Sequence, residues 1–115
     1  MENDILTTVP PQILQRVQSH LASLREFNAG IARMRSLEQR VGSAGRYEWE
    51  FRDQREPAAL ESVAWLDHFV ALARKNQVDP EVVFAALGGR PPVEPWSATA
   101  QAWRRETLDE EDSAP

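Results

Sequence analysis

The chain has 115 residues, 42% apolar and 27% charged, which predicts one globular domain with a single core. It has no cysteine, which excludes disulfide bonds, thiolate metal sites and cysteine nucleophiles and favours a cytoplasmic location. The net charge is −5, and residues 106–115 alone carry five acidic and no basic side chains. The longest apolar run, Val82–Leu87, falls far short of the roughly 20 residues of a membrane span. We therefore expect no membrane contact and no large basic face for nucleic-acid phosphates.

We expect residues 1–10, polar with scattered aliphatic side chains, to form a flexible arm. The following segment, Pro11–Val41, predicts a helix, because its apolar residues recur every three or four positions. Those residues are Leu14, Val17, Leu21, Leu24, Phe27, Ile31, Met34, Leu37 and Val41.

Two interpretations of Pro11–Val41 stay open. The segment is one helix of about 46 Å, or two helices joined at Asn28-Ala29-Gly30, since asparagine and glycine commonly end helices. An unbroken helix of this length would overhang a small domain and would need a second chain beside it. The first interpretation therefore favours a homodimer.

The segment Arg46–Arg52 alternates aromatic and charged residues after the glycine-rich joint at 42–45. Strict alternation is typical of a half-buried strand, so we expect one short strand at 46–52. The alternative is a helix with Tyr47 and Phe51 on one face and Glu48 paired with Arg52 one turn later.

Two further helices follow from start and stop signals. Pro57–Asn76 is apolar over more than half of its circumference, including Trp65 and Phe69, and is expected to be central to the core. Asp79 and Pro80 are typical of a helix start, and Gly88-Gly89 of a helix end, so a short helix is predicted over Pro80–Leu87.

The remainder of the chain predicts a linker, a helix and a tail. Residues 90–95 form a stiff proline-rich linker, and a last helix covers about Ala98–Leu108. Residues 109–115 are predicted to be a disordered acidic tail. The fold prediction is therefore all-α: a single small bundle of four or five helices over residues 11–108.

Candidate chemistry is sparse. The two histidines, His20 and His68, are far apart in the sequence, and no nucleophile motif, metal-ligand spacing or phosphate-binding loop accompanies them. We interpret His68 as a surface residue on the polar stripe of its helix and His20 as a packing residue. We expect no metal, no cofactor and no enzymatic activity, and a small enzyme using His68 is the weakest hypothesis.

The segment Leu72–Gly89 resembles the helix-turn-helix of lac-repressor-type transcription regulators. Ala73 takes the place of the small residue in the first helix, Val78 that of the apolar turn residue and Asp79 that of the cap. Val83 and Leu87 would pack inward. The resemblance covers about 18 residues and implies DNA binding, with Arg74, Lys75 and Arg90 as phosphate contacts.

The same segment departs from that family where DNA would be read. Gln77 stands at the turn position that usually holds glycine. The positions that should face the major groove cannot donate to guanine or adenine edges; they are Pro80, Glu81, Val82, Phe84 and Ala85. DNA binding is therefore the alternative function.

The preferred function is a non-enzymatic protein-interaction module: an adaptor, chaperone or inhibitor of a larger partner, acting as a homodimer. The long two-faced helix, the four tryptophans and the absence of catalytic clusters favour it, since tryptophan and arginine dominate interface energetics. The predicted partner-binding residues are Phe27, Arg33, Met34, Arg35, Leu37, Arg40, Trp49, Trp96 and Trp103.

Overall fold

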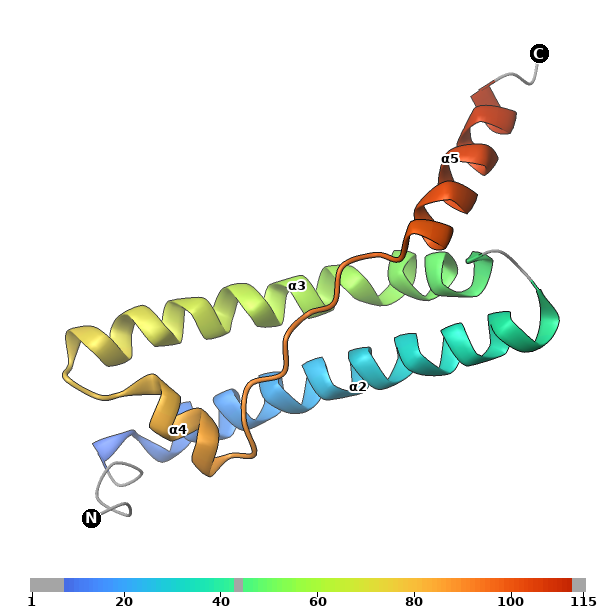
Figure 1. Ribbon diagram of the computed structural model, residues 1–115. Coiled ribbons are helices and arrows are strands. Elements are labelled where there is room, and N and C mark those ends of the chain that lie inside the picture. The colour runs from blue at the N-terminus through green and yellow to red at the C-terminus, as the bar shows by residue number, and fades with distance from the viewer. Residues whose placement is uncertain (1–7, 43–44, 113–115) are drawn as a thin grey trace. The chain divides into compact units, whose positions relative to one another are not determined.

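The computed structural model describes residues 8–42 and 45–112. The helices with bounds in these ranges are α2 (Pro11–Val41), α3 (Arg46–Lys75), α4 (Pro80–Ala86) and α5 (Ala98–Asp112) (Figure 1). No described residue is in a strand, so the all-α prediction is confirmed.

The chain divides into two compact units, and both α2 and α3 contribute to each of them. The described part of unit 1 comprises residues 8–26 and 58–93. The described part of unit 2 comprises residues 27–42, 45–57 and 94–112.

In unit 1, apolar side chains of α2, α3 and α4 form the core. Phe69 of α3 packs on Phe84 of α4, with ring centroids 5.8 Å apart. Arg25 of α2 donates from Nη2 to the backbone oxygens of Leu87 and Gly89, at 2.9 and 2.8 Å, which fixes the end of α4. Further fully buried members of this core are Val17, Leu21, Leu24, Leu66 and Val83.

The signals that predicted α4 are confirmed. The Asp79 side chain accepts a hydrogen bond from the Glu81 backbone N–H at 3.0 Å, and Pro80 is the first helical residue. The helix ends at Ala86, one residue before the predicted end. Gly89 N donates to the Phe84 carbonyl at 2.6 Å, which closes the helix as glycine-rich ends commonly do.

The first long segment is one continuous helix, which decides between its two interpretations. Its expected need for a second chain disappears, because α3 is 30 residues long and packs against α2 in both units. In unit 1, His20 shares a 2.9 Å hydrogen bond with Ser62. In unit 2, Phe27 stacks on Phe51 with centroids 5.7 Å apart.

Gly30 lies inside α2 and does not break it. A β-carbon there would overlap the ring of Phe51, including its Cε2 atom at 2.6 Å. The glycine therefore allows close approach of α3 to α2, which is a packing role and not the helix-ending role suggested by Asn28-Ala29-Gly30.

The predicted strand at 46–52 is wrong, since these residues are the first two turns of α3. The alternation prediction assumed that the charged residues face water. Instead, Glu48 and Arg52 are buried, at 0% and 1% exposure, and pair with each other along the helix. The aromatic residues between them are the half-buried ones.

Bounds of α3 and α5 also differ from the prediction. α3 does not begin at Pro57 but contains it, so the proline lies in a helix interior. Proline lacks the N–H for one intrahelical hydrogen bond, which is why it resembled a start signal. α5 continues through Asp112, so the first four residues of the predicted acidic tail belong to this helix; residues 113–115, like residues 1–7, lie outside the described residues.

We expect Gly30→Ala to lower the free energy of unfolding by about 1–3 kcal/mol, because the added methyl group would displace Phe51. At an exposed helix position the same change would stabilise by about 1 kcal/mol. Urea denaturation followed by circular dichroism measures the difference. In a Phe51→Ala background the methyl group has room, so Gly30→Ala should there be neutral or stabilising; equal losses in both backgrounds would contradict the packing role.

Candidate interaction surface

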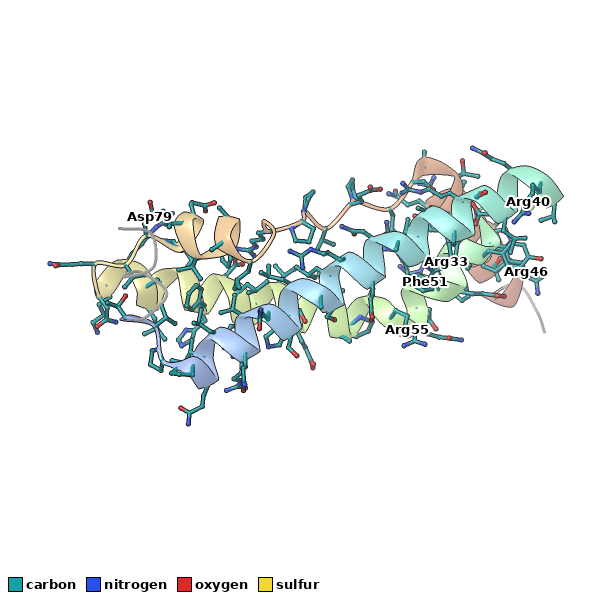
Figure 2. All side chains as sticks on the ribbon, turned by 90° about the horizontal axis from the view of Figure 1, so that it is seen from below. Arg33, Arg40, Arg46, Phe51, Arg55 and Asp79 are labelled. Carbon is teal, nitrogen blue, oxygen red and sulfur yellow. The ribbon has the colours of Figure 1, made fainter. Side chains whose placement is uncertain are left out.

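Four exposed arginines of unit 2 lie on α2 and α3. Arg33 and Arg40 lie seven residues apart on α2, which places them near the same face with about 10.5 Å between them along the axis. Arg46 and Arg55 lie on the part of α3 that belongs to unit 2. Figure 2 labels these four side chains and Phe51, and we call the four residues the arginine surface. Arg46 and Arg55 are nine residues apart, which places them on opposite sides of α3.

Most of this surface is electrostatically unpaired. Arg46 pairs with Glu50 of the next turn, at 3.2 Å, and both side chains are about half exposed. Arg33, Arg40 and Arg55 are exposed and form no ion pair with any described side chain. These guanidinium groups keep all their donors available to a partner.

A buried ion pair lies within unit 2. Glu48 Oε2 accepts from Arg52 Nε at 2.8 Å, and both side chains have 0% exposure. The same carboxylate accepts from Arg35 Nε of α2 at 2.8 Å and from the backbone N–H of Ser97 at 3.3 Å. The pair therefore links α2 and the start of α5 to α3.

The remaining donors of Arg52 hold the segment that precedes α5. Its Nη1 donates to Glu56 at 2.7 Å, and its Nη2 donates to the backbone oxygens of Glu94 and Pro95 at 3.2 and 3.0 Å. Trp96 Nε1 donates to the same Glu56 carboxylate at 2.8 Å. Every nitrogen of the buried guanidinium thus has an acceptor, which a buried cation requires.

The start of α5 also packs closely on α3. Gly45 has a φ of +91°, and a β-carbon there would lie 2.5 Å from the Ala100 backbone nitrogen. Trp49 of α3 and Trp103 of α5 contact each other with ring centroids 5.0 Å apart. Ser97 Oγ accepts from the Ala100 N–H at 3.1 Å and caps the helix.

The nine predicted partner-binding residues all belong to unit 2, but only Arg33 and Arg40 among them are exposed. Phe27 is 4% exposed and stacks under Arg52, so no partner reaches it in this conformation. Arg35 is engaged by Glu48 and by Glu94, the latter at 2.6 Å. Met34, Leu37, Trp49, Trp96 and Trp103 are half-buried.

Arg46 and Arg55 of this surface were not among the predicted partner-binding residues, and neither was Phe51. Had Arg46–Pro57 been interpreted as helix, Phe51 and Arg55 would lie one turn apart on one face. The preference for a strand hid that spacing.

The segment that resembles a helix-turn-helix has the expected turn. However, two of the residues that were expected to contact DNA bases are buried. Gln77, at the position usually held by glycine, has a φ of +63°. Pro80 and Phe84, expected to face the major groove, are buried in unit 1. Arg74 and Lys75 are exposed, whereas Arg90 pairs with Asp67 at 2.7 Å.

The remaining candidates from the sequence are the two histidines, a metal site and a membrane span. His68 is exposed, and His20 is half-buried and stacks on Trp65 at 4.7 Å. Among the described residues, no three acidic or histidine side chains converge as metal ligands would. No helix in the described ranges combines the length and apolar character of a membrane span.

Comparison of the chain with models of protein families, with curated proteins and with solved structures finds no match.

We expect Glu48→Gln to lower the free energy of unfolding at pH 7 by about 3–5 kcal/mol, because it leaves Arg52 buried with too little counter-charge. Glu50→Gln is the matched control, since it removes the exposed partner of Arg46 and should cost less than about 1 kcal/mol. Urea denaturation compares the two, and similar losses would contradict a special role for the buried pair.

The same pair predicts a pH dependence. Burial by itself would raise the pKa of Glu48, but hydrogen bonds from Arg35, Arg52 and the Ser97 N–H lower it from 4.5 to about 2. A folded-state pKa below the unfolded one stabilises the fold above about pH 4.5, and this stabilisation is lost as the pH falls through about 2. The contribution is about 3 kcal/mol. The stability gap between wild type and Glu48→Gln should therefore narrow from pH 5 to pH 2, and a constant gap would contradict this account.

Proposed function

We propose that this chain is a non-enzymatic protein-interaction module that binds an acidic segment of a partner protein through the arginine surface. The observation that supports this most is the set of unpaired, exposed guanidinium groups of Arg33, Arg40 and Arg55 on one unit. An adaptor, a chaperone and an inhibitor would each use such a surface.

The contrast with Arg35 and Arg52 of unit 2 strengthens the proposal. Arg35 and Arg52 are neutralised by carboxylates within the fold and serve its stability. Arg33, Arg40 and Arg55 have no such partner among the described residues, so their charges are available to recognise an opposite charge. Arginine is enriched at protein interfaces, and charge complementarity raises association rates and selects partners.

A protein partner fits better than nucleic acid. Proteins that bind DNA strongly neutralise several phosphates, whereas this surface offers four cations, one of which already pairs with Glu50. The whole chain is also acidic, with a net charge of −5. Mobility-shift assays on duplex DNA at low salt test the DNA-binding alternative at 72–89 and distinguish it from binding of a protein partner.

Reversing the charge of the surface should abolish partner binding. We expect the triple variant Arg33→Glu, Arg40→Glu and Arg55→Glu to lose proteins that the wild type retains from an extract of its native cell. The matched control reverses three exposed cations of unit 1: Arg16, Arg74 and Lys75. Affinity capture followed by mass spectrometry identifies the proteins, and circular dichroism verifies folding.

The capture should also weaken as salt rises, because exposed charges are screened. Proteins retained equally by both triple variants would bind elsewhere and would contradict the role of the arginine surface.

Homodimer formation stays a prediction. The long helix α2 no longer supports it, because α3 packs against α2 within the same chain. Sedimentation velocity from micromolar to millimolar concentration measures it. A dimer that dissociates on dilution is the expected result, and a monomer throughout that range would refute it.

A further inference from the structure

Unit 1 contains an open groove of about 830 Å³ between the first turns of α2 and the last turns of α3. Its surface is mainly apolar and includes Ile13, Trp65, Phe69 and Leu72. Ile13 and Leu72 are 37% and 44% exposed, which is high for large apolar residues. The volume lies in the range of small-molecule sites, which are concave and mostly apolar with a few polar groups.

One arginine side chain lies at this groove. Arg16 lines it, and the guanidinium carbon lies 5.3 Å over the ring of Trp65. The guanidinium forms no ion pair or hydrogen bond with a described residue, and no aspartate or glutamate is among the described lining residues. Asp67, the neighbour of the lining residue His68, is paired with Arg90. Burial and then the charge of Arg16 lower the pKa of His20 beside the same tryptophan.

The size of the groove favours a small ligand over a protein. Twelve described residues line it, whereas a stable protein interface uses about 20–30 residues on each side. Apolar surface with one available guanidinium suits a molecule with an apolar body and a single anionic group, since arginine binds carboxylates with two parallel hydrogen bonds.

We propose that the groove of unit 1 binds a small amphiphilic carboxylate. Its apolar body lies against Trp65, Phe69, Ile13 and Leu72, and its carboxylate accepts hydrogen bonds from Arg16. This site is independent of the arginine surface of unit 2 and of any protein partner.

The test compares two probes with the same ten-carbon chain, decanoate and decyltrimethylammonium, by isothermal titration calorimetry with the full chain. We expect saturable 1:1 binding of decanoate and at least about tenfold weaker binding of the cationic probe. Arg16→Gln should weaken decanoate binding by about tenfold or more, the scale of a lost charge-assisted contact. Arg74→Gln, which changes an exposed arginine outside the groove, is the control and should bind as the wild type does.

NMR spectroscopy tests where on the chain decanoate binds. In ¹H–¹⁵N spectra the indole signal of Trp65 should shift with decanoate, while those of the three tryptophans of unit 2 should not. Four results would overturn the proposal: no saturable binding up to about 1 mM, equal affinity for the two probes, unchanged affinity in Arg16→Gln, or shifts confined to unit 2. Self-association that Leu72→Glu abolishes would also overturn it, because a second copy would then cover the groove.

Discussion

The buried pair of Glu48 and Arg52 is the interaction on which unit 2 depends. Neither charge reaches water, so each must find its partners within the fold, and together they engage Arg35 of α2, Glu56 of α3 and the backbone before α5. A desolvated ion pair costs free energy unless every donor and acceptor is satisfied. Here that requirement fixes the positions of three segments at once.

This internal pairing also separates two kinds of arginine. Those that face Glu48 are neutralised and stabilise the fold, whereas Arg33, Arg40 and Arg55 remain exposed without a described counter-charge. The proposed binding of an acidic partner concerns only the second kind. In unit 1 the corresponding contrast is between an apolar core closed by α4 and a groove in which Arg16 has no ion pair with any described residue.

The sequence predicted the helices whose signals are local. Periodic apolar residues predicted Pro11–Val41, and the Asp79 cap with its proline predicted α4 to within one residue. The prediction failed over residues 46–57, where the pattern depends on neighbours. An alternation of aromatic and charged residues predicts a strand only if the charges face water, and Glu48 and Arg52 face each other inside the protein instead.

The sequence by itself determined the helical class, the absence of cysteine chemistry and the supply of arginine and tryptophan, because these follow from composition and local period. The tertiary structure decided which charges are buried and which remain free, since that depends on contacts between residues far apart in the chain. Gly30 shows the same division. Its identity suggested a break in the helix, but the ring of Phe51, brought to it by α3, is the reason that a glycine is needed there.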